Sequence, residues 1–206
     1  ILCGPVAMYE RFLHEIAPHV KTDAFIGSTY IQGMHFPTTA RRLGIPTSCT
    51  LFGFFLYPFV SRVMEYGRQA WFYPKRLTEV AACGPRASEV IAVMHQILPE
   101  PEKIEPLTGN FTTCILNTGN SAIHPARLHG IFRDWDFESS FEAGSFPKLY
   151  ADMDDYSADS IARVDAEIQL VKTALIARHP GLKLDSCIPW TDQIMRVYGE
   201  YIGDPS

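Results

Sequence analysis

The sequence is poor in positive charge and in long apolar runs. Its 18 lysines and arginines stand against 23 acidic residues, so the net charge is −5, and no basic run occurs along the chain. Nucleic acids and anionic lipids attract clustered lysine and arginine, so neither is an expected partner. No uncharged apolar stretch reaches the roughly 18 residues that a membrane-spanning helix needs. The first residues also lack the basic flank of a signal peptide.

Cysteine is sparse, and its spacing excludes several classes of site. Zinc sites and redox motifs use closely spaced pairs, and small secreted domains use dense disulfide frameworks. The five cysteines here are scattered singly: Cys3, Cys49, Cys83, Cys114 and Cys187. A reducing cytoplasm is the expected location. His124 and His129 are five residues apart rather than four, which does not place two ligands on one helical face, so no metal site is predicted.

A glycine-rich phosphate loop is also missing. Gly27, Gly33 and Gly53 are too far apart to form the G-x-G-x-x-G turn that seats a pyrophosphate at a helix N-terminus, and they are typical of turns and strand ends. The chain opens at Ile1 without a methionine, on residues typical of a strand that enters a loop. This is an unusual place for a natural protein to begin.

The apolar pattern of the first half predicts an α/β fold. A hydrophobic content of 47% can fill a packed core. Apolar residues recur at helical spacing over 6–16, and Pro18 is expected to end that helix. The short apolar run at 24–27 predicts a buried strand of a parallel sheet, and the run at 47–52 predicts another strand. Further strands are predicted at 70–73 and 80–83, followed by a helix over 86–98.

Three prolines within residues 99–106 predict a connector between two domains, because proline neither donates to a strand ladder nor extends a helix. We therefore expect an α/β domain over 1–107 and a helical domain over 108–206. The clearest helix is predicted at 158–178, with Ser157 as its N-cap. Its apolar stripe consists of Ile161, Val164, Ile168, Val171 and Leu175. Residues 134–156 lack a clean period and predict a long ordered loop.

The most pointed polar cluster runs from Asn117 to Pro125. His124 directly precedes Pro125, which favours extended backbone before the proline and predicts that the imidazole lies at a helix start. A histidine in such a position can exchange a proton near neutral pH, which reduction of a carbonyl or imine requires. Packing or surface exposure is the alternative reading for any one of the seven histidines.

A second cluster is the aromatic run at 51–60, which is followed by Arg62. Core packing explains its aromatic residues. Arg62, however, is expected in apolar surroundings, where a guanidinium needs a carboxylate or a ligand as its partner. The carboxylate of a keto acid could serve as that partner.

Three blocks of sequence resemble the opine dehydrogenases of the octopine and tauropine type from marine invertebrates. The first is Ile-Ala-Pro-His-Val-Lys at 16–21, and the second is Tyr-Pro-Phe-Val-Ser-Arg-Val-Met-Glu-Tyr-Gly at 57–67. The third pairs Ile-His-Pro at 123–125 with Phe-Arg-Asp-Trp-Asp at 132–136. The blocks occur in the family's order from Ile1 to about Tyr201.

This resemblance implies a Rossmann-type NAD-binding domain, present here in part, followed by a helical substrate domain, with the active site between them. It implies NADH-dependent reductive condensation of an amino acid with pyruvate, with NAD as cofactor. His124 would handle protons, and Ser61 stands where the family has a cysteine. The remaining implied contacts are Asn117, Ser61 and Arg62 to the substrate, and Pro5 and Val6 to the cofactor.

Two other interpretations stay open. A reductase of the glycerol-3-phosphate or ketopantoate type shares the architecture but uses a lysine as proton donor, and no lysine here lies in a comparable position. A non-catalytic binding protein could keep the fold without the glycine turn. The resemblance also places the acidic partner of the histidine in a block that has no match after His179. We therefore expect the 206 residues alone to bind NADH poorly and to show no turnover.

Overall fold

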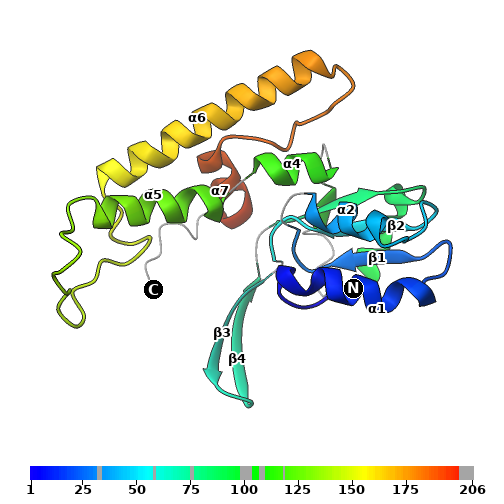
Figure 1. The fold of residues 1–206 in the computed structure, drawn as a ribbon, viewed down its shortest axis with the longest axis horizontal. Coiled ribbons are helices and arrows are strands. Elements are labelled where there is room, and N and C mark those ends of the chain that lie inside the picture. The colour runs from blue at the N-terminus through cyan, green and yellow to red at the C-terminus, as the bar shows by residue number, and fades with distance from the viewer. Residues whose placement is uncertain are drawn as a thin grey trace.

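The computed structural model describes residues 1–31, 34–57, 59–74, 77–97, 104–106, 110–117 and 119–199. The molecule has an α/β half and a helical half, and a β-hairpin projects from the boundary between them (Figure 1). Gly33, Leu98, residues 99–103 and Leu107 lie outside the described residues. The division of the chain at 107/108 therefore stays a prediction.

The sheet of the α/β half has the order β1-β2-β5-β6. Its strands are β1 (Phe25–Ser28), β2 (Thr50–Phe54), β5 (Thr78–Cys83) and β6 (Ile104–Pro106). Strands β1 and β2 are parallel, as predicted, and Leu2 bridges to Ser28 in the same direction. Strand β5 runs antiparallel to β2, while β6 is parallel to β5, so the sheet is mixed.

The reversal has a topological cause. Between β2 and β5 the chain makes a hairpin from β3 (Phe59–Glu65) and β4 (Gln69–Pro74). Parallel neighbours need a long crossover, usually a helix, whereas a chain that returns through a hairpin comes back in the opposite direction. The connector prediction is also wrong for residues 104–106, which pair with β5 as strand β6. Proline is tolerated there because a strand at the sheet edge need not donate on both sides.

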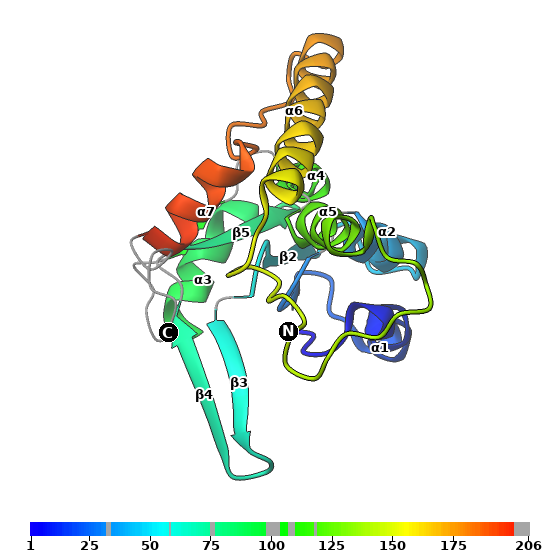
Figure 2. The same cartoon turned by 90° about the vertical axis from the view of Figure 1, so that its left-hand side faces the viewer.

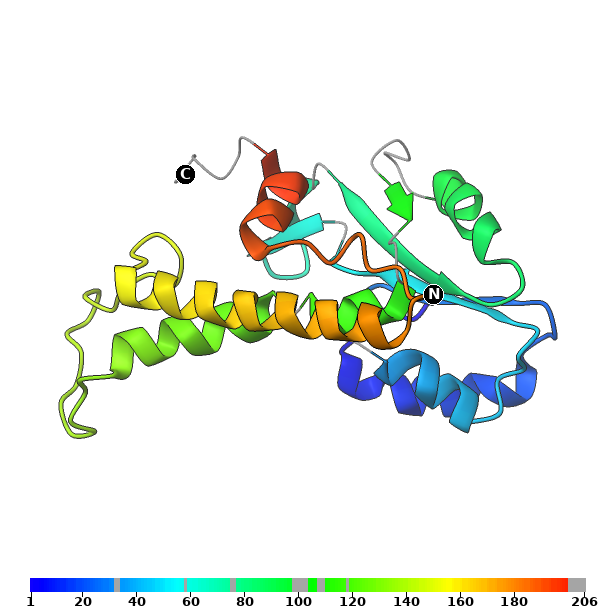
Figure 3. The same ribbon diagram turned by 90° about the horizontal axis from the view of Figure 1, so that it is seen from above.

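Helices cover both faces of this sheet (Figure 3). On one side lie α1 (Tyr9–Ile16) and α2 (His35–Arg42), and on the other lies α3 (Val90–Ile97). Strand β2 serves both layers, since Leu51 packs with Tyr9 and Phe36 while Phe52 and Phe54 pack with the α3 residues. Three short 3-10 helices flank these elements: η1 (Val6–Met8), η2 (Ala17–His19) and η3 (Ala87–Glu89).

Helix α4 (Asn110–Leu116) joins the two halves. Phe111 and Cys114 pack into the α1/α2 side of the α/β core, and Leu116 packs with Leu184 and Cys187 of the helical half. The other long elements of that half are α5 (Asn120–Phe132), α6 (Asp155–Arg178) and α7 (Trp190–Tyr198). Helices α5 and α6 run side by side in opposite directions (Figure 3).

The start of α6 differs from the prediction. Asp154, not Ser157, is the N-cap, and its Oδ1 accepts a hydrogen bond from the backbone N–H of Ser157 at 2.7 Å. Ser157 is buried against α5 at Gly130, where a Cβ atom would lie 2.1 Å from the Ser157 Oγ. The serine was unsuitable as a cap because helix packing uses its side chain.

The predicted apolar stripe of α6 is covered only in part. Ile168 and Leu175 pack against the helical core, whereas Val164 and Val171 are 39% and 50% exposed. The predicted loop is confirmed over residues 134–154, which contain neither helix nor strand, but Asp155 and Tyr156 belong to α6. In the described part of the chain, no helix combines the length and apolar character needed to cross a membrane.

Candidate functional site

A pocket of about 240 Å³ lies between the α/β half and the helical half. We call it the interlobe pocket. Its first wall follows the carboxyl ends of β1 and β2 and consists of Tyr30, Ile31, Phe55 and Leu56. Its second wall consists of Cys114, Ile115, Asn117, Gly119, Asn120 and Ser121, from α4, the following turn and the start of α5. Ligands of α/β folds bind beyond the carboxyl ends of the parallel strands, so this pocket is the candidate site.

The first wall is held by hydrogen bonds to one carbonyl. The Tyr9 hydroxyl donates to the Tyr30 carbonyl oxygen at 3.0 Å, and the Ser28 hydroxyl donates to the same oxygen at 3.2 Å. The Tyr30 ring stacks on Tyr57 with centroids 4.9 Å apart. Burial raises the pKa of both the Tyr9 and the Tyr30 phenols. These tyrosines therefore form a neutral, ordered wall at neutral pH.

The second wall depends on a turn that only glycine suits. Gly119 has a φ of +41° and precedes α5. A Cβ atom at this position would lie 3.1 Å from the Trp190 ring, so a side chain would be both strained and crowded. Asn117 donates from its Nδ2 to the Ser186 carbonyl at 3.0 Å, which ties the same turn to the segment before α7. Asn117 also lines the pocket, and its contact with substrate stays a prediction.

His124 lies inside α5, not at its start as predicted. The helix begins at Asn120, and Pro125 falls within it. Pro125 has no N–H to donate, so one helical hydrogen bond is missing. The first turn is nevertheless closed by the N–H groups of Ala122 and Ile123, which both donate to the Gly119 carbonyl, and the helix continues past the proline. Residues three and four apart share a helical face, so His124 lies on the face of α5 that carries Asn120 and Ser121. This face borders the interlobe pocket.

The imidazole of His124 has a phenol as its partner. Its Nε2 lies 2.8 Å from the hydroxyl oxygen of Tyr150, which belongs to the long loop before α6. Burial raises the pKa of Tyr150, and the positive charge of Arg62 opposes this shift. Arg62 is thus close enough to act on the phenol that binds His124. Three segments distant in sequence bring a cation, a phenol and an imidazole to one neighbourhood.

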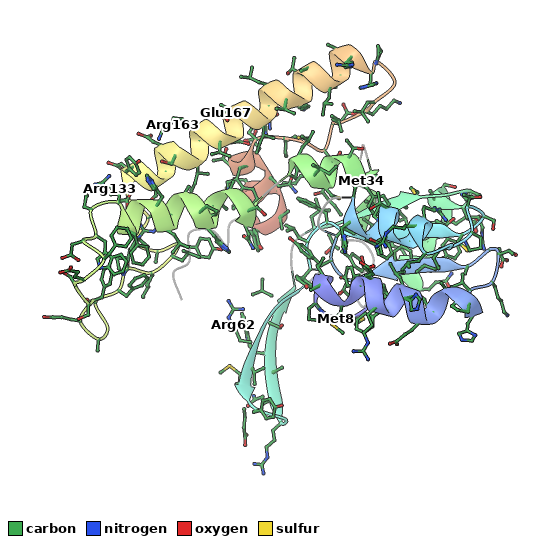
Figure 4. All side chains as sticks on the ribbon, in the orientation of Figure 1. Met8, Met34, Arg62, Arg133, Arg163 and Glu167 are labelled. Carbon is green, nitrogen blue, oxygen red and sulfur yellow. The ribbon has the colours of Figure 1, made fainter. Side chains whose placement is uncertain are left out.

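Arg62 is not in the apolar surroundings that we predicted. It lies on the exposed hairpin of β3 and β4, which projects from the sheet (Figure 2), and its Nη1 donates to the Ser61 carbonyl at 2.8 Å. The apolar run leaves the core after Phe55: Leu56 is only partly buried, and Tyr57 and residues 61–66 are exposed. Figure 4 shows the Arg62 side chain standing clear of the hairpin, on the side away from α1. Ser61 is exposed beside it.

Pro5 and Val6 lie at the carboxyl edge of the sheet. The Leu2 N–H donates to the Gly27 carbonyl at 2.7 Å, in parallel with β1, so the residues after it pass the carboxyl end of that strand. Pro5 is exposed and precedes η1, while Val6 packs partly against the core. This location agrees with where a cofactor binds in such folds, and the contact itself stays a prediction.

Two residues of the site were missed at the sequence level, Tyr150 and Arg127. Arg127 is only 1% exposed and forms an ion pair of 2.6 Å with Asp154. The available signal was the acidic cluster over 152–155 and an arginine three residues after the histidine. The contacts of Tyr150 with His124 and of Arg127 with Asp154 both reach across a loop without periodicity, so no local sequence pattern indicated them. Among the described residues, no three histidine, cysteine or acidic side chains gather as a metal site would require.

No family model matches this chain. It is 25% identical over 207 residues to the octopine dehydrogenase of Mizuhopecten yessoensis, which covers 99% of this chain and 51% of that protein. It is 23% identical over 213 residues to the opine dehydrogenase of Haliotis discus hannai, covering 99% and 50% respectively. The chain therefore spans about half the length of the curated relatives it matches.

A solved structure of octopine dehydrogenase with NADH and pyruvate superposes with a TM-score of 0.81 at 20% identity. The match covers 98% of this chain and 51% of that one. The resemblance to opine dehydrogenases is thereby confirmed over almost the whole chain, and so is the fold class of an α/β part followed by a helical part.

Proposed function

We propose that this chain carries part of the active site of an opine dehydrogenase, which joins an amino acid to pyruvate by NADH-dependent reduction. The observation that carries the proposal is that His124 contacts Tyr150, and Arg62 acts on the same phenol, on the face of α5 whose Asn120 and Ser121 line the interlobe pocket. The group combines a proton carrier, a neutral hydrogen-bond donor and a cation. Reductive condensation of an amine with a keto acid needs these three functions. The relatives named octopine and opine dehydrogenase support the same reaction.

The reaction assigns a role to each group. The amine nitrogen attacks the keto carbon, the keto oxygen leaves as water, and a C=N bond forms. When NADH is bound, it supplies the hydride that reduces the imine carbon, and the nitrogen gains a proton. His124 gives the proton that the departing oxygen requires and takes the proton that the attacking amine releases. The Arg62 guanidinium pairs with the keto-acid carboxylate and thereby orients the carbon that reacts.

The residues present suit the nicotinamide end of the cofactor. Tyr30 and Phe55 give the interlobe pocket an apolar wall, and Asn117 adds an amide. A flat ring that carries a carboxamide requires this combination of surfaces. Pro5 and Val6, at the carboxyl edge of the sheet, would contact the same group. Asn117 and Ser61 would contact substrate. The sequence contains no G-x-G-x-x-G turn for the pyrophosphate.

A cytoplasmic location is part of the proposal. None of the five cysteines, all of which the structure describes, forms a disulfide, and Cys49, Cys114 and Cys187 are buried. Buried thiols that are not joined in disulfides suit a reducing compartment. The partners are then small molecules, an amino acid and pyruvate. The net charge of −5 argues against nucleic acid.

The test is an NADH-oxidation assay of the full-length protein with pyruvate and arginine, taurine, alanine or glycine. We expect oxidation with at least one pair, and a loss of kcat of about 100-fold or more in His124→Asn. NADH binding, followed by fluorescence, should be retained. His129→Asn is the matched control, since His129 lies on the same helix and contacts Tyr156 instead. No oxidation with any amino acid, or full activity in His124→Asn, would overturn the proposal.

A further inference from the structure

We propose that a small cavity between the turn at Gly119, α6 and α7 is the binding site of one water molecule, which donates hydrogen bonds to the amide oxygen of Gln193 and to the carboxylate of Asp165. The cavity has a volume of about 20 Å³. A single ordered water needs roughly 10–15 Å³, so this space suits one water molecule rather than a substrate. The inference stands apart from the proposed function, because it concerns hydrogen bonds within this chain.

The lining of the cavity combines aliphatic side chains with three that carry carbonyl or carboxylate oxygens. These three are Asn117, Asp165 and Gln193. They come from the turn before α5, from α6 and from α7, so the cavity lies where three segments distant in sequence meet. A purely apolar cavity stays dry, whereas two or more polar partners can hold a water molecule in place.

Gln193 brings a buried oxygen that lacks a donor. The residue is only 2% exposed, and its Nε2 lies 2.7 Å from Oε2 of Glu79. An ionised carboxylate accepts hydrogen bonds and cannot donate them, so the amide nitrogen is the atom that faces Glu79. Oε1 of Gln193 is buried and finds no donor among the residues that the structure describes. Such an oxygen is costly to leave unpaired, which favours a donor from outside the chain.

The other two polar groups of the lining also offer acceptors. Oδ2 of Asp165 accepts a hydrogen bond from the Trp190 N–H at 3.0 Å, and a carboxylate can accept several more. Nδ2 of Asn117 donates to the Ser186 carbonyl at 3.0 Å, so its amide nitrogen is engaged outside the cavity. A site surrounded by acceptors needs a ligand with hydrogens to donate. Water has two, one for Gln193 and one for Asp165.

The bound water continues a chain of hydrogen bonds from one half of the molecule to the other. Asp165 on α6 holds the first residue of α7 through the backbone N–H of Trp190. The water joins the same carboxylate to Gln193, one turn further along α7, and Gln193 holds Glu79 on β5. Asn117 lines both this cavity and the interlobe pocket. The water therefore stiffens the packing behind the second wall of that pocket.

The experiment combines a crystal structure of the full-length protein with ¹⁷O relaxation dispersion of water, which counts long-lived internal water molecules. We expect a water within about 2.7–3.2 Å of both Gln193 Oε1 and an Asp165 carboxylate oxygen. Ala122 lines the cavity, so Ala122→Val should fill it and lower the count by one. Ala126→Val is the matched control, because Ala126 lies on the same helix and outside the lining. It should leave the count unchanged.

Thermal unfolding gives a second measurement. Ala122→Val leaves Gln193 Oε1 without a donor, so its Tm should lie about 2 °C or more below that of Ala126→Val. If Ala122→Val does not fold, the crystal structure of the unsubstituted protein still decides. No water between Gln193 and Asp165, or an unchanged count in Ala122→Val, overturns the proposal. A higher Tm in ammonium chloride than in sodium chloride at equal concentration would show that a cation binds there instead, and would overturn it too.

Discussion

Nε2 of Gln193, on α7, lies 2.7 Å from Oε2 of Glu79, on strand β5, although 114 residues separate the two along the chain. Nη1 of Arg196, one turn further along α7, lies 3.2 Å from the other carboxylate oxygen. Glu79 and Gln193 are both almost fully buried. This contact fixes the helical half to strand β5, which lies inside the sheet between β2 and β6. The width of the interlobe pocket therefore depends on a polar contact between the halves.

Gln193→Leu should destabilise the protein. It removes the donor from a buried carboxylate and leaves Glu79 with fewer bonds to replace its hydration. We expect a loss of about 2–3 kcal/mol in the free energy of unfolding, measured by urea denaturation. The double variant Glu79→Leu/Gln193→Leu is the control, since replacing both partners by apolar groups should recover part of the loss. A loss below about 0.5 kcal/mol in the single variant would contradict this interpretation.

Arg62→Ala should impair the reaction without affecting stability. Arg62 lies on the exposed hairpin, so its removal creates neither a cavity nor a buried unpaired group. A charge-assisted bond to a carboxylate contributes about 1.5–3 kcal/mol, so we expect KM for pyruvate to rise about 10-fold or more. Steady-state kinetics at varied pyruvate measures this. Arg68→Ala on the same hairpin removes only a surface ion pair with Glu65 and should leave KM unchanged.

The helices and strands were predictable where their signals are local. The strands β1 and β2 and the helices α1, α3 and α6 follow from the spacing of apolar residues within each segment. The direction of β5 was not predictable in this way. It depends on whether the preceding segment crosses over as a helix or returns as a hairpin, and that is a property of the whole connection. The apolar run before Arg62 likewise could not show where the chain leaves the core.

Only part of the candidate site could be predicted from the sequence. His124 stood out because a polar cluster and a proline surround it. Tyr150 and Arg127 did not, since their partners lie 26 and 27 residues away in sequence. The loop between them has no period. Its order comes from packed aromatic rings such as Phe132 with Phe141 and Phe146, and from hydrogen bonds to one guanidinium. Such contacts depend on tertiary geometry rather than on local propensity.

Asp154 makes the attachment of the loop at 148–154 to Arg127 sensitive to acid. The backbone N–H of Ser157 holds the pKa of this carboxyl below its usual range, with further contributions from the Ser157 hydroxyl and from Arg127, while desolvation opposes the shift. The folded state therefore binds fewer protons than the unfolded state below pH 4. This contribution to stability is present above the ordinary pKa of 3.8 and is lost as the pH falls through the lower folded pKa.

Asp154→Asn isolates the charge, because asparagine is also a good N-cap while it cannot form the ion pair with Arg127. We expect this variant to be less stable than the unsubstituted protein at pH 7, and the difference to shrink as the pH is lowered below 4, in urea denaturation at a series of pH values. Asp154→Ala loses the cap as well, so it should stay less stable than Asp154→Asn at every pH. A stability difference between the unsubstituted protein and Asp154→Asn that is the same at pH 7 and pH 3 would show that the carboxylate charge does not hold the loop.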